Sequence, residues 1–477
     1  MSEPREIRFF NSLGRRSEVF SPIEAGKVHL YTCGPTVYNH VHIGNLRTFL
    51  FEDVLRRSLI YLGYEVVHVM NLTDVDDKTI RGAMERGVEL DDYTEEFIQS
   101  FFDDLDALNV ERAEEYPRAT RHVPEMITLT EQLLANGHAY KADDGSIFFR
   151  IASDDDYGRL SGIDPEQTRQ GERVASDEYE KEDVRDFVLW KAAKDGEPFW
   201  DSPWGPGRPG WHIECSAMGM KYLGETFDIH CGGVDNMFPH HENEIAQSES
   251  ATGKPFVHTW LHSEHLIVDG AKMSKSLGNF FTLKDLIGKG LDIRALRYLF
   301  VSSHYRQKLN FTFESLHAAE SALKRIDEMR FRVESAGVEG GPREDVTAAI
   351  RELEEEFAAG LADDLNVSAS LAALFNFVKA VNKAVEGEVL GEGDRERIEA
   401  ALTSIDRVLG VIDPAPWKKT GDEAEGLSDE DVDRLIEERQ AARKSRDFAN
   451  ADRIRDELQA AGIVIEDTAQ GVRWRRE

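Results

Sequence analysis

The sequence lacks the features of a membrane-spanning or secreted protein. No apolar run approaches the length of a membrane span, and the start, MSEPREIRFF, has no apolar core of a secretory signal. Three cysteines in 477 residues are too few for a disulfide framework. We therefore expect a cytoplasmic protein in which Cys33, Cys215 and Cys231 are buried, bind metal or act in catalysis.

Basic residues are also scarce. The chain has 57 Lys and Arg against 90 Asp and Glu, and the net charge of −33 opposes binding to nucleic acid at low ionic strength. Molar salt shortens the Debye length to about 3 Å and makes such a charge tolerable. We hypothesise a salt-loving organism with a high-salt cytoplasm, and the alternative is an ordinary acidic enzyme.

What is present is typical of a globular protein of about three domains, with 41% hydrophobic and 9% aromatic residues. Residues 28–31 and 65–70 have the pattern of strands, and residues 46–62 have that of a helix. This βαβ unit predicts a parallel α/β sheet with a ligand at the carboxyl ends of its strands. A polar stretch over about 157–191 indicates an insertion.

The second half of the chain has helical patterns. Apolar spacing predicts helices over 314–335, 345–386 and 394–411. A polar joint leads to Ser428, a predicted N-cap, and to two helical stretches that end near Gly462. A predicted hairpin follows, with strands IVIED and VRWRR on either side of TAQG.

The segment FPHHENEIAQ has a metal-binding pattern. His240 and Glu244 lie four residues apart and share one face of a predicted helix, whereas His241 points about 100° away. With Cys33 and Cys215 they would provide two thiolates, one imidazole and one carboxylate, which are ligand types suited to zinc. The alternative is a helical ion pair beside two buried thiols. Cys231 is a weaker ligand candidate.

Two loops suit phosphate groups. In VHIGN, residues 41–45, a loop meets a helix expected to start near Leu46, whose free N–H groups and positive end attract anions. In AKMSKSLGN, residues 271–279, two lysines could hold triphosphate oxygens. Taken alone, each segment is also compatible with an ordinary turn.

Together, HIGN, KMSKS and the zinc-like set resemble the class I aminoacyl-tRNA synthetases, and most closely the cysteinyl-tRNA synthetases. The resemblance extends over almost the whole chain, through CGPTVYNHVHIGN, NLTDVDDK, GWHIECSAM, HHENE, KMSKSLGNFF, RKSRDFANADRIRDEL and IEDTAQGVRW. One departure is Asn45, where the class signature usually ends in histidine.

The resemblance implies a domain order. A Rossmann-like catalytic domain would span 1–302, with an insertion over about 145–220. A connecting stem-contact region over 303–344, a helical bundle over 345–413 and a small α+β anticodon-binding domain over 428–477 would follow.

The resemblance also implies residue roles. One zinc ion, which also takes the substrate thiolate, would be bound by Cys33, Cys215, His240 and Glu244. ATP with Mg²⁺ would be bound by His42, Gly44, Asn45 and Lys275, and catalysis would rest on His42, Asn45, Lys272 and Lys275. The amino-acid pocket would be lined by Gly34, Thr36, Thr73, Trp211, His230 and Asp235. The implied activity is charging of tRNA(Cys) with L-cysteine by a monomer that binds neither DNA nor membranes.

A basic stripe near the end of the chain suits the RNA partner. Between residues 439 and 455, six basic residues stand against two acidic ones, and RWRR follows at 473–476. The predicted tRNA contacts are Arg439, Arg443, Arg446 and Trp474, because guanidinium groups and an aromatic ring suit an unstacked base. The alternative is a solvated helix face with a core tryptophan.

Three other functions are considered. A cysteine:amino-sugar ligase of the mycothiol type would form the same adenylate, but it resembles a synthetase without an anticodon domain. The intact HIGN, KMSKS and metal residues disfavour a non-catalytic RNA-binding relative. A zinc hydrolase would leave KMSKS unexplained.

Overall fold

The computed structural model describes residues 5–163, 183, 185–387, 389–417, 429–468 and 471–476. The chain folds into two compact units, Met1–Asp413 and Pro414–Glu477. Within the described residues, no helix is both long enough and apolar enough to cross a membrane.

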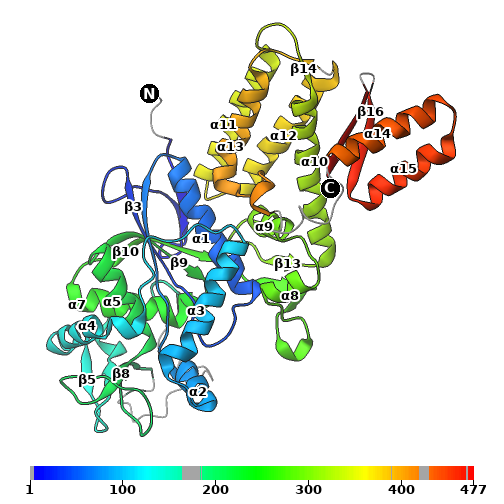
Figure 1. Cartoon of the computed structure of the whole chain (residues 1–477). Coiled ribbons are helices and arrows are strands. Elements are labelled where there is room, and N and C mark those ends of the chain that lie inside the picture. Colours follow the sequence, from blue (N-terminus) through cyan, green and yellow to red (C-terminus); the bar gives the residue numbers. More distant parts are fainter. Residues whose placement is uncertain are drawn as a thin grey trace. The chain divides into compact units, whose positions relative to one another are not determined.

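A four-stranded parallel sheet forms the centre of the first unit (Figure 1). Its strands are β3 (Lys27–Thr32), β4 (Glu65–Met70), β9 (Phe227–Gly233) and β10 (Val257–Ser263), in the order β10-β9-β3-β4. All neighbouring strands pair in parallel, which confirms the predicted α/β fold. The strand order reverses between β3 and β9, and ligands of open α/β sheets bind at such a switch point.

Helices cover both faces of this sheet. Helix α1 (Ile43–Tyr61) covers one face, where its Leu55 shares a core with Leu30 of β3. The other face is covered by α4 (Val123–Ala135), α5 (Trp211–Leu223) and α7 (Glu242–Thr252). Side chains alternate along a strand, so Tyr31, the neighbour of Leu30, belongs to this second core.

Helix α1 begins three residues before the predicted start near Leu46. His42 is its N-cap: the His42 side chain accepts from the Asn45 N–H, and the Asn45 side chain accepts from the His42 N–H. This reciprocal capping satisfies two N–H groups at the start of the helix. Residues 43–45 therefore form the first helical turn and not a preceding loop.

An antiparallel sheet lies between α4 and α5 in sequence. It contains β5 (Ala139–Lys141), β6 (Ile147–Phe149), β7 (Phe187–Ala192) and β8 (Gly207–Pro209). The sheet begins with β5 at Ala139, before the predicted start of the insertion at about 145. Helix α5, which packs on β3, already begins at Trp211, before the predicted end of the insertion at about 220. The stretch 157–191, expected to be polar, ends in the buried strand β7, and residues 164–182 and 184 of it lie outside the described residues.

Further elements of the first unit precede and follow the strands of the central sheet. A hairpin of β1 (Arg8–Asn11) and β2 (Arg16–Val19) precedes β3, and α2 (Asp77–Arg86) and α3 (Leu90–Ala107) follow β4. After β10, the strands β11 (Leu266–Val268), β12 (Ala271–Lys272) and β13 (Leu309–Phe311) form a small sheet. Helices α8 (Leu283–Gly288) and α9 (Ile293–Ser302) lie between β12 and β13 in sequence. Strand β12 therefore carries the start of the KMSKS segment.

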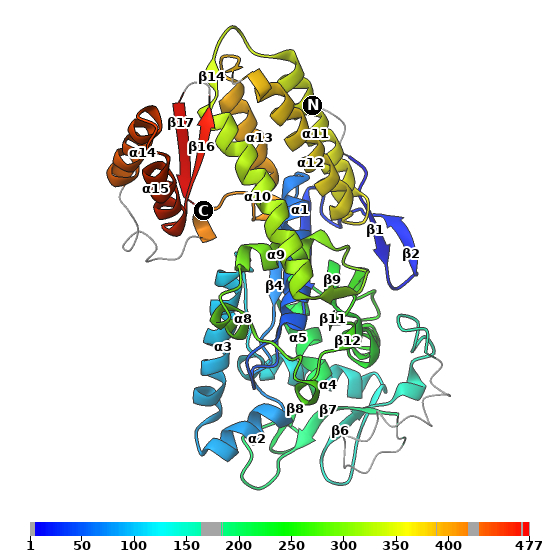
Figure 2. The ribbon, with the colours of Figure 1, turned by 90° about the vertical axis from the view of Figure 1, so that its right-hand side faces the viewer.

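Long helices follow β13 (Figure 2). They are α10 (Phe313–Ser335), α11 (Glu344–Ala362), α12 (Val367–Ala384) and α13 (Asp394–Leu409), with a short parallel pair of β14 (Gly337–Val338) and β15 (Val389–Leu390). The single helix predicted over 345–386 is wrong, because Asp364 and Leu365 have φ values of 55° and 53° and break it. Tyr305 Oη donates to the Asp364 carboxylate and holds this bend in place.

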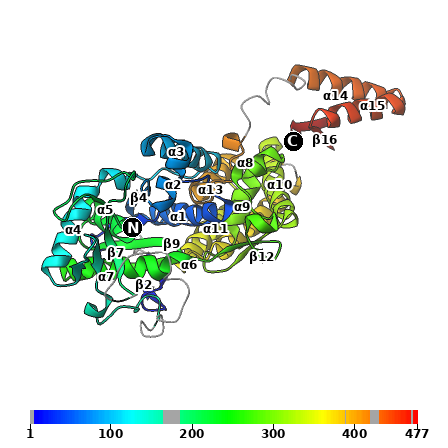
Figure 3. The ribbon, with the colours of Figure 1, turned by 90° about the horizontal axis from the view of Figure 1, so that it is seen from below.

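The second unit joins two helices to a hairpin (Figure 3). Its elements are α14 (Asp429–Lys444), α15 (Phe448–Ala460), β16 (Ile463–Thr468) and β17 (Gly471–Arg476). Thr468 pairs with Gly471, so each strand extends one residue into the predicted TAQG turn. Ser428, the predicted N-cap, lies outside the described residues, as do residues 469 and 470.

Candidate active site and metal centre

The four predicted metal ligands lie at the switch point of the sheet. Cys33 directly follows β3, Cys215 lies near the start of α5, and His240 and Glu244 lie on either side of the start of α7. The sulfur, nitrogen and oxygen atoms that they offer all lie within 4.8 Å of one another, and all four residues are buried. One ion can therefore reach all four ligands.

The Glu244 carboxylate lies between two imidazoles. Its Oε2 is 3.0 Å from His230 Nε2, and its Oε1 is 3.1 Å from His240 Nε2 but has no hydrogen-bond partner in the described part of the chain. A buried carboxylate oxygen without a hydrogen bond is costly. A metal ion would satisfy this oxygen, and two thiols with one imidazole are donors that zinc prefers.

Burial favours the neutral forms of these groups. A hydrogen bond with Cys215, together with burial, raises the pKa of Cys33 well above its ordinary value. Burial also raises the pKa values of Cys215 and Glu244, and it lowers the pKa of His240. Metal binding must then expel protons from the two thiols and the carboxyl group, so the affinity for metal falls as the pH falls.

His241 also contacts this cluster, contrary to its predicted direction. Its Nε2 is 3.3 Å from Cys33 Sγ, and Cys33, His230, His241 and Glu244 form a second group whose ligand atoms lie within 4.8 Å of one another. The prediction assumed a regular helix, whereas Met237–His241 form a wider π turn that contains the extended residue Phe238. His262 Nε2 lies 2.8 Å from His241 Nδ1 and fixes its ring.

Cys231 lies on the opposite side of the central sheet from the cluster. It belongs to the core under α1, whereas Cys33 and Cys215 belong to the core on the opposite face. Because successive side chains of β9 alternate, His230 faces the ligands and Cys231 faces away.

Loops after β3 and β4 form one side of the predicted amino-acid pocket. Gly34 N donates to Asn71 Oδ1 at 3.0 Å, and a Cβ on Gly34 would clash with the Asn71 carbonyl oxygen. Thr36 and Thr73 form a parallel bridge between the two loops. Glycine at position 34 is therefore required by the close approach of these loops.

The other predicted pocket residues come from α5, β9 and the short helix α6 (Val234–Asn236). Trp211 stacks on His240 with ring centroids 4.2 Å apart and is 41% exposed, so it covers the cluster on its solvent side. His230 is fully buried and stacks on Trp260. Asp235 is exposed, and its charge acts on the His42 imidazole.

Sequence reasoning missed three residues that support the site. Thr73 Oγ1 donates to Glu214 Oε2 at 3.0 Å, and Asn71 Nδ2 donates to Thr73 Oγ1 at 3.2 Å. His212 Nδ1 lies 3.0 Å from His240 Nδ1 and can orient that ligand. The helical spacing of GWHIEC was the available signal, because it places residues 212 and 215 one turn apart.

The HIGN and KMSKS segments meet in the structure. Ile43 N donates to the Phe281 carbonyl oxygen at 3.0 Å, and His42 forms an antiparallel bridge with Thr282. A Cβ on Gly44 would lie 3.1 Å from Met273 Cε. The start of α1 and the KMSKS segment therefore form one continuous surface.

The Nε2 atom of His42 can donate a hydrogen bond. Burial lowers its pKa, so the imidazole is neutral near pH 7. Its Nδ1 accepts from Asn45 N at 3.2 Å, which leaves the proton on Nε2, where it can be donated to a phosphate oxygen. Lys272 is exposed on β12, and the side chain of Lys275 lies outside the described structure.

The residues of the second unit that are predicted to contact tRNA differ in how far their side chains are exposed to solvent. Arg443 and Arg446 are exposed, whereas Arg439 is only 7% exposed, and the RNA contacts expected of all three stay predictions. Trp474 Nε1 donates to Asp433 at 2.7 Å, and the ring packs on the core of the unit. Phe448, which sequence reasoning missed, is 61% exposed at the start of α15 beside Arg446.

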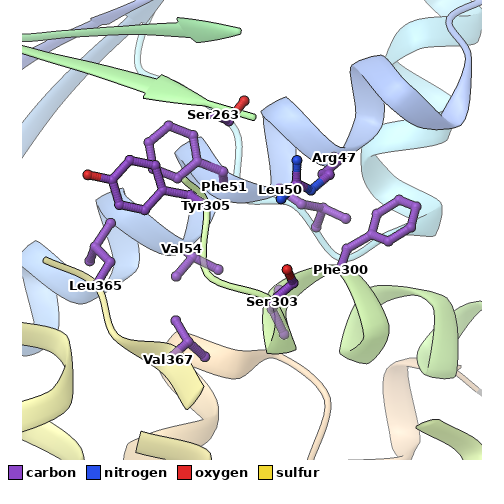
Figure 4. Close-up of a pocket in the computed structure, with 11 residues that line it drawn as sticks. Arg47, Leu50, Phe51, Val54, Ser263, Phe300, Ser303, Tyr305, Leu365 and Val367 are labelled. Atoms are coloured by element: carbon purple, nitrogen blue, oxygen red, sulfur yellow. The ribbon is translucent and has the colours of Figure 1, made fainter. Parts of the chain in front are cut away.

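A separate small cavity lies where α1 and α9 meet the bend after α11 (Figure 4). Its volume is about 20 Å³, and Leu50, Val54 and Phe300 are among the side chains that line it. This is room for about one water molecule. The cavity is therefore too small for an amino acid or a nucleotide.

Family models and curated relatives show which family this chain belongs to. The family described as "tRNA synthetases class I (C) catalytic domain" matches residues 19–321, the DALR domain matches 356–413, and the "Cysteinyl-tRNA ligase anticodon binding domain" matches 426–475. The chain is 47% identical to the cysteine–tRNA ligase of Brachyspira hyodysenteriae and 48% identical to that of Solibacter usitatus, over 99% of this chain and 100% of each relative. The chain belongs to the cysteinyl-tRNA synthetase family.

Solved structures share the fold of this family at much lower identity. Mycobacterium tuberculosis methionyl-tRNA synthetase in complex with methionyl-adenylate has a TM-score of 0.60 and 16% identity, over 80% of this chain and 92% of that chain. Agrobacterium radiobacter K84 LeuRS, from a ternary complex, has a TM-score of 0.60 and 12% identity, over 83% and 86%. These likenesses confirm the predicted class I synthetase fold.

Proposed function

We propose that this chain activates L-cysteine with ATP to cysteinyl-adenylate and then transfers the cysteinyl group to the 3′ end of tRNA(Cys). The proposal rests on one arrangement: a cluster of two thiols, an imidazole and a carboxylate at the switch point of the sheet that also carries HIGN. The mycothiol-type ligase is not favoured, because residues 426–475 match an anticodon-binding domain.

One zinc ion would be held by Cys33, Cys215, His240 and Glu244. Bound there, zinc would supply a soft Lewis acid that prefers a thiolate to a hydroxyl group, which distinguishes cysteine from serine. His230 holds the Glu244 carboxylate, and Trp211 covers His240 against solvent. Together with Gly34, Thr36, Thr73 and Asp235, these two residues would bind the amino acid.

Catalysis would rest on positioning and electrostatics. The cysteine carboxylate attacks the α-phosphorus of ATP, and pyrophosphate leaves with its Mg²⁺. The Nε2–H of His42 and the N-terminus of α1, where Gly44 and Asn45 lie, would stabilise charge on the transferring phosphate. Lys272 and Lys275 would bind the leaving pyrophosphate oxygens. The terminal ribose hydroxyl of the tRNA then attacks the adenylate carbonyl carbon, and AMP leaves.

The second unit would read the anticodon. Arg443 and Arg446 would contact phosphates or base edges, and the exposed ring of Phe448 is better placed than Trp474 to stack on a base. We further propose a cytoplasmic monomer from a salt-loving organism. The complete ligand cluster within one chain supports a monomer, and the net charge of −33 supports a high-salt setting.

The test is pyrophosphate exchange with ATP, followed by charging of tRNA, with cysteine and serine compared in the presence of zinc. We expect exchange and charging that depend on cysteine. Exchange with cysteine but no charging of tRNA at any salt concentration would favour the amino-sugar ligase over the synthetase. Equal rates with serine would refute the role assigned to the zinc cluster.

Lys275→Ala tests the predicted role of the KMSKS segment. We expect it to slow cysteine-dependent exchange about 10²-fold or more, since one charge-stabilising donor is removed from the transition state. The melting temperature should change little. Lys284→Ala, at an exposed lysine of α8, is the control and should keep the exchange rate of the unmodified chain. Equal rates in the two variants would contradict the role of Lys275.

A further inference from the structure

A chain of hydrogen bonds joins the loops after β3 and β4 to the start of α5. Gly34 N donates to Asn71 Oδ1 at 3.0 Å, and Asn71 Nδ2 donates to Thr73 Oγ1 at 3.2 Å. Thr73 Oγ1 then donates to Glu214 Oε2 at 3.0 Å, and the side chains of Asn71, Thr73 and Glu214 are buried. Its first and last members, Gly34 and Glu214, are each next in sequence to a cysteine of the metal cluster. The chain therefore lies beside the predicted amino-acid pocket.

The direction of this chain is fixed at its start. A backbone N–H can only donate, so the amide oxygen of Asn71 faces Gly34 and its NH₂ group faces Thr73. The NH₂ group can only donate, so Thr73 accepts from Asn71 and gives its single hydroxyl proton to Glu214. A carboxyl group can accept this proton in its ionised or its neutral form, so the direction of the chain does not require Glu214 to be ionised.

Thr73 is left with acceptor capacity only. Its hydroxyl oxygen has two lone pairs, of which Asn71 occupies one, and no other hydrogen bond to this oxygen occurs in the described part of the chain. Of the three polar groups of cysteine, the thiolate would bind zinc and the carboxylate would attack ATP, and neither of them donates a hydrogen bond. Only the α-ammonium group of cysteine has protons to donate to Thr73.

We propose that Glu214 is a positioning residue that makes Thr73 the acceptor for the α-ammonium group of the amino acid. Without an acceptor at position 214, the Thr73 proton would be free to turn towards the ligand, where it would repel the ammonium group. This inference rests on the proposed function, since it takes Thr73 as part of the cysteine pocket. It gives Glu214 a part in substrate specificity without a contact to the reacting atoms.

The experiment compares the dissociation constants of L-cysteine and β-mercaptopropionate for the zinc-loaded chain by calorimetry. The two ligands share the thiol and the carboxylate, and only cysteine has the ammonium group. In Glu214→Leu we expect the preference for cysteine to fall about tenfold or more, which is the usual effect of losing a hydrogen bond to a charged group. Displacement of zinc or of Cys215 would weaken both ligands alike and would leave their ratio unchanged.

Further variants test whether Glu214 acts through Thr73. Glu214→Gln keeps an acceptor oxygen and should restore the preference for cysteine. Thr73→Val should lose as much preference as Glu214→Leu, and the double variant should lose no more than either single variant. Thr130→Val is the matched control, because Thr130 is an equally buried threonine of α4 whose hydroxyl donates to the Met126 carbonyl oxygen, and it should keep the preference.

The possible outcomes separate this inference from the proposed function. An unchanged ratio in Glu214→Leu, or additive losses in the double variant, would overturn the role of Glu214 and leave the synthetase function standing. Glu214→Val takes the place of Glu214→Leu if the leucine variant does not fold. Failure of the unmodified zinc-loaded chain to bind cysteine and to exchange pyrophosphate would instead overturn the proposed function.

Discussion

The three cysteines show how position in a parallel sheet decides the chemistry of a residue. Cys33 and Cys215 face the same side of the sheet and reach Glu244, whereas Cys231 is buried in the opposite core. Burial raises the pKa values of Cys215 and Cys231 alike, so thiol acidity does not distinguish them. Only the two on the ligand side can lose a proton to a metal ion.

This difference predicts the outcome of two serine substitutions. Cys215→Ser should reduce bound zinc from about one ion per chain to well below one, because a serine hydroxyl stays protonated and is a poor zinc ligand. Cys231→Ser, at an equally buried thiol, should keep its zinc. Metal content after dialysis against a weak chelator measures both. A zinc-replete Cys215→Ser chain would refute the ligand set.

The ligand set could be predicted only in part from the sequence. The spacing of His240 and Glu244 gave one imidazole and one carboxylate, but the two cysteines were joined to them by resemblance and not by geometry. His241 was misplaced, because the extended conformation of Phe238 is invisible in the spacing of the residues. Glu214 and Asn71 act through hydrogen bonds across the pocket, which no local pattern reveals.

At the scale of elements, strands were predicted more accurately than helix boundaries. Strand β4 matches its predicted bounds, because three valines lie between the turn residues Gly63 and Asn71. Helix α1 was predicted to start late, because histidine is not among the preferred N-cap residues and the apolar pattern becomes clear only at Leu46. The bend at Asp364 depends on a partner distant in sequence, Tyr305, and so could not be read locally.

A buried charged network joins α1 to α9. Arg297 Nη2 lies 2.7 Å from Asp53 Oδ2, and Arg57 Nε lies 2.9 Å from Asp53 Oδ1, with all three side chains buried. Arg297 also donates to the carbonyl oxygens of Leu108 and Leu409. Burial alone would raise the pKa of Asp53, but the charges of Arg297 and Arg57 lower it below 3.8.

Removal of this carboxylate should destabilise the first unit. Asp53→Asn leaves the buried Arg297 guanidinium without its counter-ion and leaves Arg57 with only the more exposed Glu111, and breaking such a buried pair typically costs about 3–5 kcal/mol. Lys254→Gln, which breaks an exposed pair with Glu225, should cost less than about 1 kcal/mol. Denaturant unfolding at pH 7 compares the two. A loss below about 1 kcal/mol in Asp53→Asn would contradict the role of the network.

The same network predicts that the stabilising effect of Asp53 depends on pH. Because the pKa of Asp53 is lower in the folded chain than its ordinary 3.8, its stabilising effect is complete above pH 3.8 and disappears as the pH falls through the folded value. The difference in stability between the unmodified chain and Asp53→Asn should therefore shrink below about pH 4. A stability difference that grows on acidification would contradict the lowered pKa of Asp53.

At the scale of the whole molecule, charge and function oppose each other. The chain must attract a polyanion, yet it carries 33 more acidic than basic residues. The second unit has exposed basic residues close together, with Arg443 near the end of α14 and Arg446 shortly before α15. Long-range repulsion from the remaining surface must still be reduced for the RNA to approach, and salt reduces it.

The charge therefore predicts that folding itself responds to salt. At 0.1 M the Debye length is about 10 Å and repulsion between neighbouring carboxylates persists, whereas near 1 M it is about 3 Å and that repulsion is screened. We expect the melting temperature to rise by at least about 4 °C between 0.1 and 2 M KCl, which for a unit as large as Met1–Asp413 corresponds to about 3–4 kcal/mol. Sucrose at equal osmolality is the control, because it strengthens burial without screening charge. An equal rise in sucrose, or none in KCl, would identify an ordinary acidic enzyme, whereas a rise specific to salt would show that the surface is adapted to a screened medium.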